Sequence, residues 1–311
     1  MTDLAIVGSG ISALTAAIYA AREGLSVCIF EKEMIGGIIT TSENVENYPG
    51  FEAGISGIGL MKKVRAQAEK FGARIEYGEV SDIRAESDRV LMKVDGADFE
   101  ARTLLLAVGN SYRRLGLARE DEFFGRGIHV CATCDGAIYA GKEVVAVGGG
   151  DNAVQEALFL AQFAKVKLLV RSQLRAQQIL QDRLSEAVKA GKIEVLLGAE
   201  IEEILFGQSD LGEKIRGVKV RQMEHGEPRK FEISADAIFE FIGFDPQTQF
   251  LAGSGVELNP KGEIVVNNNL QTSVDRIFAC GDAVENAEHQ LVIAAGSGAK
   301  AAIEISKSLH Q

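Results

Sequence analysis

The sequence predicts an α/β protein that contains two similar units, and three observations carry this prediction. A pattern of apolar strand, glycine turn, helix and second strand occurs twice, at residues 4–31 and 144–171. The chain has 34 glycines and only 4 prolines, which is typical of a fold with many tight strand-to-helix turns. Its 311 residues correspond to two domains of roughly 150 residues each.

Charge and hydropathy exclude several kinds of partner. A formal net charge of -11 disfavours nucleic acid and anionic membranes, because both require a basic surface. The N-terminal residues MTDLAIVGSG lack the basic stretch and apolar core of an export signal, and no apolar run approaches the roughly 18 residues of a membrane span. We therefore expect a cytoplasmic protein that has no nucleic-acid or membrane partner.

The first glycine turn predicts a dinucleotide-binding site. An apolar strand leads into Gly8 and Gly10, and a helix follows. Because glycine has no side chain, the backbone can approach a pyrophosphate at the helix N-terminus, and Ala13 lets the helix pack closely on the strand. Glu31 follows Gly8 by 23 positions, where an acid can accept hydrogen bonds from ribose hydroxyls.

The second glycine turn predicts a second dinucleotide. Gly148, Gly150 and Ala153 repeat the spacing of the first turn, but Arg171 takes the place of the acid. An arginine here can pair with a 2′-phosphate, which favours NADPH over NADH. The alternative is that Arg171 only places a charge in solvent at the end of a strand.

The pair Cys131 and Cys134 is the candidate reaction centre. Two cysteines at this spacing can form an easily reduced disulfide, half of a zinc site or a structural disulfide. We expect no metal, because Cys28 and Cys280 are isolated in apolar strands and the 4 histidines include no HxxxH pair. We expect both isolated cysteines to be small buried thiols.

Asp135 directly follows the cysteine pair. A carboxyl group beside a dithiol can give a proton to a leaving thiolate or take one from an attacking thiol. The alternative is a helix N-cap, in which the side-chain oxygen accepts a backbone N–H.

The order of the segments predicts that one domain is inserted into the other. Residues 55–76 have helical periodicity, and residues 77–108 and 193–244 contain short strands. IFACGDA and an apolar helix from about residue 290 resemble a return to the first unit. We expect two Rossmann-like, three-layer ββα domains, the first formed by residues 1–113 and 245–311 and the second by residues 114–244.

The motifs resemble those of the low-molecular-weight thioredoxin reductases over residues 4 to about 303. The most specific similarity is the cysteine motif placed between the two nucleotide turns. The matching segments are Gly8-Ser-Gly10, Gly36-Gly37, Glu46-Asn47-Tyr48-Pro49-Gly50, Cys131-Ala-Thr-Cys134-Asp135-Gly136, Gly148-Gly-Gly150 and Phe278-Ala-Cys-Gly281-Asp282.

The resemblance implies FAD in the first domain and NADPH, with NADH as an alternative, in the second. Glu31 would contact the adenosine ribose, Asn47 the isoalloxazine, Asp282 the ribityl and pyrophosphate region, and Gln290 the pyrimidine edge. The implied FAD residues are Gly8, Ser9, Gly10, Ile11, Ser12, Ala13, Glu31, Lys32, Gly36, Gly37, Ile38, Asn47, Gly109, Gly281, Asp282, His289, Gln290 and Leu291. The implied nicotinamide nucleotide residues are Gly148, Gly150, Asp151, Asn152, Ala153, Arg171 and Arg175.

The resemblance also implies separate roles for the reactive residues. Cys134 would take electrons from the flavin, Cys131 would attack the disulfide of thioredoxin or a thioredoxin-like protein, and Asp135 would be the acid and base. Family members are homodimers in which the nucleotide domain rotates. We expect the hinge at about residues 113–118 and 244–247.

Three departures from the family pattern concern the cofactors. The segment Val170-Arg171-Ser172-Gln173-Leu174-Arg175-Ala176 is one residue shorter than the family's basic cluster and has one arginine fewer. NADH, or another electron donor such as ferredoxin, is therefore an alternative to NADPH. A flavin-binding redox sensor with little turnover is an alternative to a reductase. Ile38 replaces the usual glutamine and His289 the usual arginine near the flavin.

Overall fold

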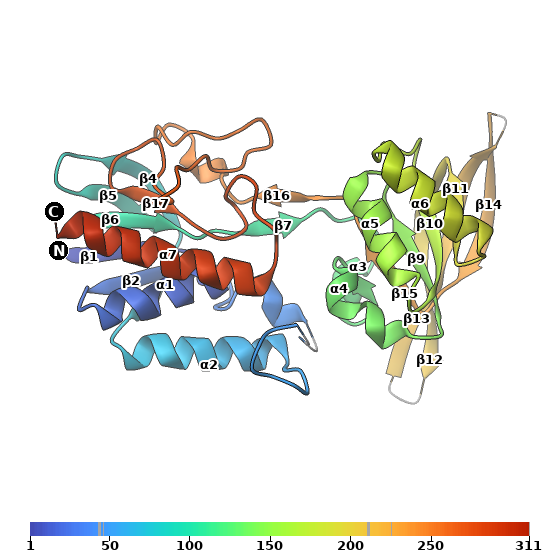
Figure 1. The fold of residues 1–311 in the computed structure, drawn as a ribbon, viewed down its shortest axis with the longest axis horizontal. Helices are drawn as coiled ribbons and strands as arrows, with labels where there is room; N and C mark the ends of the chain where they lie inside the picture. The colour runs from blue at the N-terminus through green and yellow to red at the C-terminus, as the bar shows by residue number, and fades with distance from the viewer. Residues whose placement is uncertain (43–44, 46, 210–211, 225, 311) are drawn as a thin grey trace. The chain divides into compact units, whose positions relative to one another are not determined.

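The computed structural model describes residues 1–42, 45, 47–209, 212–224 and 226–310 (Figure 1). The chain folds as two compact units, and one is inserted into the other. Unit 1 comprises Met1–Ser111 and Phe244–Gln311, and unit 2 comprises Tyr112–Gly243. No helix among the described residues is long and apolar enough to cross a membrane.

Unit 1 is built on a seven-stranded sheet with strand order β3-β2-β1-β6-β5-β4, in which β17 also pairs with β6. The strands β3, β2, β1, β6 and β17 run parallel, and the pairs β4–β5 and β5–β6 are antiparallel. The strands are β1 Thr2–Val7, β2 Val27–Glu31, β3 Arg74–Tyr77, β4 Val80–Ala85, β5 Val90–Val94, β6 Ala97–Leu106 and β17 Ile277–Ala279. The helices are α1 Ile11–Arg22, α2 Gly57–Lys70 and α7 Leu291–Leu309, with the 3-10 turns η1 Ile38–Thr41 and η3 Gln249–Leu251.

Unit 1 has two hydrophobic cores, one on each face of its parallel strands. Leu4 and Ile6 of β1 pack with α1 and α7 on one face of the sheet, whereas Ala5 packs with Phe30 and the β4–β5 side on the other. Side chains alternate between the two faces of a strand, so one buried strand serves both cores. Helices α1 and α7 lie side by side (Figure 1). Gly298 permits this contact, because a Cβ atom there would clash with the carbonyl oxygen of Ser12.

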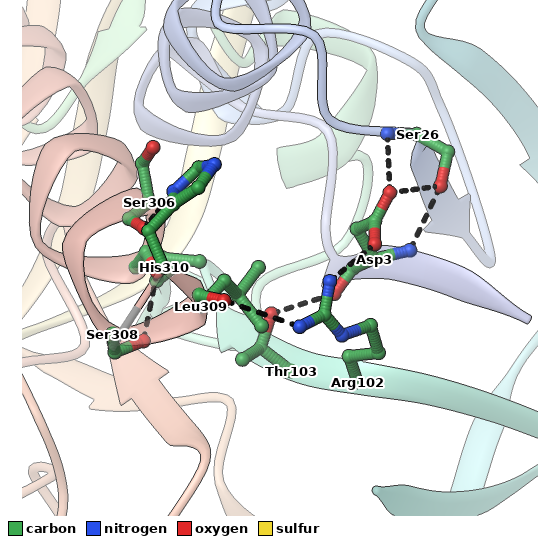
Figure 2. Close-up of polar contacts among 9 residues, drawn as sticks. Asp3, Ser26, Arg102, Thr103, Ser306, Ser308, Leu309 and His310 are labelled. Atoms are coloured by element: carbon green, nitrogen blue, oxygen red, sulfur yellow. Dashed lines mark hydrogen bonds and ion pairs between the residues drawn. The ribbon is translucent and has the colours of Figure 1, made fainter.

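A polar cluster ties β1, β6 and the end of α7 together (Figure 2). Arg102 donates to the Asp3 carboxylate at 3.0 Å and to the Leu309 carbonyl at 3.2 Å. Ser26 also donates to Asp3, from its backbone at 2.9 Å and its hydroxyl at 2.6 Å. Burial alone would raise the pKa of Asp3, but the Ser26 and Arg102 hydrogen bonds outweigh it and lower the pKa.

Unit 2 contains a five-stranded parallel sheet with strand order β11-β10-β9-β15-β8 and a three-stranded antiparallel sheet, β12-β13-β14. The strands are β8 Ile128–His129, β9 Glu143–Val147, β10 Lys165–Val170, β11 Ile193–Leu197, β12 Ala199–Ser209, β13 Gly212–Glu224, β14 Glu227–Ser234 and β15 Ala237–Glu240. The helices are α3 Glu120–Phe123, α4 Ala132–Asp135, α5 Asp151–Leu160 and α6 Gln178–Lys189, with the 3-10 turn η2 Gly136–Tyr139. The short strands β7 Asn110–Tyr112 and β16 Phe244–Pro246 pair where the chain passes between the units.

One boundary differs from the sequence prediction. The helical periodicity over residues 55–76 predicted one helix, but α2 ends at Lys70 and β3 occupies Arg74–Tyr77. The reason is Gly72, whose φ of +96° ends the helix and redirects the chain into the sheet. The final helix, expected from about residue 290, is α7.

Candidate active site

The first glycine turn lies between β1 and α1 and leaves backbone open to a ligand. Gly8 has a φ of +93°, and a Cβ atom there would clash with the carbonyl oxygen of Ala107. Gly10 precedes the helix in an extended conformation, and a Cβ atom there would meet nothing within 4 Å. Ser9, Ile11, Ser12 and Ala13 are buried around the turn. The arrangement leaves the N-terminal N–H groups of α1 available for a phosphate.

Glu31 at the end of β2 is held rigidly beside this turn. One carboxylate oxygen accepts from the Ser9 backbone at 3.0 Å and the Ser9 hydroxyl at 2.6 Å, and the other accepts from the Glu33 backbone at 2.9 Å. A cavity of about 260 Å³ opens next to it. Its lining residues are Val7, Gly8, Phe30, Glu31, Lys32, Gly78, Glu79, Val80, Val108, Gln247, Gln249 and Phe250.

The paired glycines lie directly opposite the first turn. Gly36 donates its backbone N–H to the Ser9 hydroxyl at 3.0 Å, and both Gly36 and Gly37 have positive φ. A Cβ atom on Gly37 would lie 3.3 Å from the Cα of Gly10. Ile38 follows at the start of η1 and is exposed. The structure thus brings these predicted residues together with the first turn.

The segment around Gly281 completes the same region of unit 1. A Cβ atom on Gly281 would lie 2.6 Å from the Ser12 hydroxyl, and the Gly281 N–H donates to the Ser297 hydroxyl at 3.0 Å. Burial raises the pKa of the neighbouring Asp282, and the charge of His289 opposes this effect.

The chain before α7 brings further predicted residues near Asp282. The Asn110 side chain donates to the Asp282 carbonyl at 2.8 Å and lies 3.4 Å from the His289 ring. Gln290 precedes α7, whose first residue is Leu291, and its side chain accepts from the Asn47 amide at 3.3 Å. Gly109, which precedes Asn110 at the start of β7, has a φ of +64°. Glu46, part of the quoted motif, lies outside the described residues.

The second glycine turn, between β9 and α5, has the same construction. Gly148 has a φ of +146°, and a Cβ atom there would lie 2.5 Å from the Phe241 carbonyl oxygen and 2.6 Å from the Ala153 Cβ. Gly150 faces open space. Asp151 starts α5 and accepts two hydrogen bonds from Gln177, at 2.7 and 2.9 Å.

The two arginines of the shortened basic segment lie near this turn. Arg175 donates its backbone N–H to the Gly149 carbonyl at 2.7 Å, which folds the segment after β10 back onto the turn. The side chain of Arg171 is 82% exposed, with Glu200 at 4.0 Å. Asn152 is exposed on the first turn of α5. Both arginine side chains are therefore accessible to a ligand in unit 2.

Cys131 and Cys134 form a disulfide at the start of α4. Their Cα atoms are 5.3 Å apart, both residues are partly exposed, and the Thr133 hydroxyl lies 3.2 Å from the Cys131 sulfur. The Glu156 carboxylate of α5 accepts the Ala132 N–H at 2.5 Å and so fixes the start of α4. Burial raises the pKa of Glu156, partly offset by the N–H groups of Ala132 and Thr133. The disulfide is accessible and its backbone is anchored.

Asp135, which follows Cys134 in the chain, is buried, with 7% of its surface exposed. It precedes η2 but makes no side-chain capping hydrogen bond there, so the capping alternative is wrong. One carboxylate oxygen lies 3.2 Å from Nδ1 of His129 on β8. A buried carboxyl thus occupies the residue that follows Cys134 in the chain.

Cys28 and Cys280 are free and buried, as the sequence predicts. Burial raises the pKa of each thiol to about 12. Thiols that stay protonated are unreactive, so both are packing residues.

Several residues of the site carried no signal in the sequence. His129 contacts Asp135, Ser297 binds the Gly281 backbone, and Asn110 binds the Asp282 backbone. The cavity beside Glu31 also includes Gln247 and Gln249, which are far away in the sequence. Such contacts depend on tertiary folding and follow no fixed spacing.

Two dinucleotide turns and a disulfide between them in the chain define a class of flavin- and nucleotide-dependent disulfide oxidoreductases. The chain belongs to the pyridine nucleotide-disulphide oxidoreductase family, whose model matches residues 2–299. Its relatives include the thioredoxin reductase of Mycolicibacterium smegmatis, 38% identical over 99% of this chain and 97% of the relative. The thioredoxin reductase of Bacillus subtilis is 37% identical over 99% of this chain and 95% of the relative.

A solved structure gives the same result for the fold. The thioredoxin reductase of Streptococcus pyogenes superposes with a TM-score of 0.90 at 35% identity, covering 100% of this chain and 98% of that one. The predicted α/β class with two Rossmann-like domains, the resemblance to thioredoxin reductases and the enzyme class of disulfide oxidoreductase are confirmed.

Proposed function

We propose that the protein is an FAD-dependent reductase that passes electrons from a nicotinamide nucleotide to the Cys131–Cys134 disulfide and on to thioredoxin or a thioredoxin-like protein. The observation that carries this proposal is the partly exposed disulfide beside the buried Asp135, in the unit that also holds the second glycine turn. The names of the relatives, which include an NADPH-dependent thioredoxin reductase of Arabidopsis thaliana, support it.

Unit 1 is the FAD-binding domain in this proposal. The residues of unit 1 fit FAD because the backbone at Gly10 is open and because a cavity of about 260 Å³ lies beside the fixed Glu31 carboxylate. Glu31 would accept hydrogen bonds from the ribose, and Asn47, Asp282 and Gln290 would contact the flavin half. Bound FAD supplies a carrier that accepts two electrons at once and passes them to a disulfide.

Unit 2 is the nicotinamide nucleotide-binding domain in this proposal. The open turn at Gly150 would receive the pyrophosphate, and the exposed side chains of Arg171 and Arg175 would pair with a 2′-phosphate. We propose NADPH as the donor. NADH is the alternative, since only two arginines serve this group and each charge-assisted contact is worth about 1.5–3 kcal/mol.

The dithiol has two separable roles. Cys134 would accept electrons from the reduced flavin, and Cys131 would attack the partner disulfide to form a mixed disulfide, which Cys134 then resolves. Asp135 would protonate the leaving thiolate and later remove a proton from the attacking thiol. One flavin face cannot serve a nicotinamide and a disulfide together, so we propose a domain rotation about residues 113–118 and 244–247.

We further propose a homodimer in the cytoplasm. Exposed apolar side chains of unit 1, Ile58, Val292 and Ile293, support an interface between copies. The free thiols Cys28 and Cys280 support a reducing compartment.

The test is the reduction of oxidised thioredoxin by NADPH with serine variants of each cysteine. Cys134→Ser should retain FAD and lose turnover, and Cys131→Ser should lose turnover while its remaining thiolate still perturbs the flavin spectrum. Cys28→Ala is the matched control, because this thiol is buried in the core of unit 1, and it should retain activity. Intact activity in both serine variants would remove the dithiol from the reaction.

A further inference from the structure

Within unit 2, a buried polar chain begins at Asp135, the residue that follows Cys134. Asp135 lies 3.2 Å from Nδ1 of His129, and Nε2 of the same ring lies 2.8 Å from the Tyr139 hydroxyl. All three side chains are buried: 7% of Asp135, 4% of His129 and 8% of Tyr139 is exposed. A histidine inside a core with both ring nitrogens beside polar groups is costly to fold unless those groups pair with it.

The two ring nitrogens have different surroundings. Tyr139 is within hydrogen-bond distance of Nε2. Nδ1 is fully buried, and among the described residues it meets no aligned hydrogen-bond partner, although the Asp135 carboxylate is 3.2 Å away. The 3.2 Å separation is nevertheless within the range of an N–H···O hydrogen bond. The ring can then donate Nδ1–H to an ionised Asp135 while Nε2 accepts from Tyr139, or accept from a protonated Asp135 while Nε2 donates.

We propose that His129 is the positioning residue of Asp135: held by Tyr139, it orients the carboxyl and shares the proton that Asp135 delivers to the disulfide. The inference rests on the proposed function, because it assumes that Asp135 is the acid. An imidazole retains a proton at higher pH than a carboxyl does. A carboxyl paired with a histidine can therefore draw on the proton of the imidazole.

The proton balance of the step is simple. Bound FAD in its reduced form would supply the two electrons that break the bond between the two sulfurs, which would leave Cys134 and Cys131 each as a thiolate. The Asp135–His129 pair gives one proton to the Cys131 thiolate, and the pair later recovers a proton from solvent. The Cys134 thiolate remains.

Other ionisable groups face this chain from neighbouring elements. Glu156 of α5 binds the Ala132 N–H at the start of α4, and Lys142 lies 5.2 Å from the centre of the Tyr139 ring. From β15, the strand that pairs with β8, Phe239 contributes an uncharged ring 5.2 Å from the histidine ring. Glu156 is bound to backbone N–H groups, and the contact given for Lys142 is with the Tyr139 ring. His129 is thus the group placed to exchange a proton with Asp135.

The test measures electron transfer inside the holoenzyme. Under anaerobic conditions, one equivalent of dithionite reduces the flavin, and the flavin absorbance recovers as the electrons pass to the disulfide. The rate of recovery is measured from about pH 6 to about pH 9. The main variant is His129→Asn, because the amide can still donate an N–H toward Asp135 but cannot take up a proton.

We expect His129→Asn to slow the recovery about tenfold or more near pH 8.5 and less than about threefold near pH 6, where protons from solvent are more abundant. Tyr139→Phe keeps the ring and removes the hydroxyl, so it should show the same trend with a smaller loss. His310→Asn is the matched control, because this histidine binds the Ser306 carbonyl in α7, and its rates should equal those of the unsubstituted protein.

A second measurement does not depend on electron transfer. In the NMR spectrum of the oxidised protein, the imidazole signal that disappears in His129→Asn should also move in Asp135→Asn and Tyr139→Phe, but not in His310→Asn. If that signal is unchanged in Asp135→Asn, the contact does not exist in solution and the inference fails.

The outcomes separate the inference from the proposed function. If the flavin absorbance recovers slowly in Asp135→Asn but at the normal rate in His129→Asn, the inference is overturned and the proposed function is not. A recovery rate that is reduced by the same factor at every pH in His129→Asn would also overturn the inference, because such a result would show that His129 has a structural role only. An Asp135→Asn variant that recovers at the normal rate would instead remove the acid from the proposed function.

Discussion

Glu240, at the end of β15, has a fully buried carboxyl group in unit 2, and it makes the stability of the protein depend on pH. Its side chain is 0% exposed, and neither oxygen has an aligned hydrogen-bond partner among the described residues. The Arg114 guanidinium lies 3.6 Å away and is bound more closely by Glu120, at 2.8 Å. Burial, reinforced by the charge of Glu120, raises the pKa of Glu240 to about 9.

The sign of the effect follows from the protons bound in each state. An unfolded glutamic acid has a pKa of about 4.3, so between that value and about 9 the folded protein holds one proton more than the unfolded chain. Stability is therefore highest below the lower value and falls as pH rises through this window, by up to about 1.4 kcal/mol per pH unit. From pH 6 to pH 8 the loss is about 2–3 kcal/mol.

The variant Glu240→Gln isolates this contribution, because glutamine resembles the protonated acid and does not titrate. The free energy of unfolding is measured by urea denaturation of the holoenzyme at several pH values. The difference between variant and unsubstituted protein should grow in favour of the variant as pH rises. Glu143→Gln, at the exposed start of β9, is the matched control because solvent screens its charge. A difference that stays constant from pH 6 to pH 8 would refute the reasoning.

Three other substitutions test separate parts of the structure. Gly8→Ala should abolish FAD retention after gel filtration, because the new Cβ would clash with backbone and φ is +93°; a yellow, stable variant would contradict the proposed site. Arg171→Ala combined with Arg175→Ala should raise KM for NADPH about tenfold or more and leave KM for NADH within about twofold, and equal changes for both would place the 2′-phosphate elsewhere. Arg102→Ala should lower the free energy of unfolding by about 1 kcal/mol through two lost hydrogen bonds. Because the pKa of Asp3 is lowered in the folded protein, the contribution of its carboxylate to stability should be present above the unfolded pKa of about 3.9 and should disappear as pH falls below that value. A loss of stability in Arg102→Ala that is confined to alkaline pH would contradict this.

The sequence was sufficient for the fold because its strongest signals are local. Two strand–glycine–helix patterns each fix a turn, since Gly8 and Gly148 adopt positive φ against backbone carbonyls that no other side chain would tolerate. The pairing of Cys131 with Cys134 needs only a spacing of three residues. Glu31 could be found in the same way, from its fixed offset at the end of β2.

The features that the sequence did not reveal arise from tertiary contacts. No sequence pattern distinguishes His129 from its neighbours in the short strand β8. Its contact with Asp135 of α4 forms only when unit 2 folds. Glu240 stands in an apolar run that is typical of a buried strand, so no pattern indicates that its carboxyl is buried beside Glu120. The helix expected over residues 55–76 was too long because the pattern gave no weight to Gly72, whose backbone ends it.

An anaerobic titration with NADPH, and separately with NADH, tests the central claim most directly by counting the electrons that the holoenzyme accepts. If electrons pass from FAD to the Cys131–Cys134 disulfide, the flavin absorbance should be lost completely only after the holoenzyme has taken up two electrons for the disulfide in addition to the two for the flavin. Flavin reduction that is complete after two electrons would show that the disulfide does not share electrons with the flavin, and no reduction by either nucleotide would show that the electrons come from another donor.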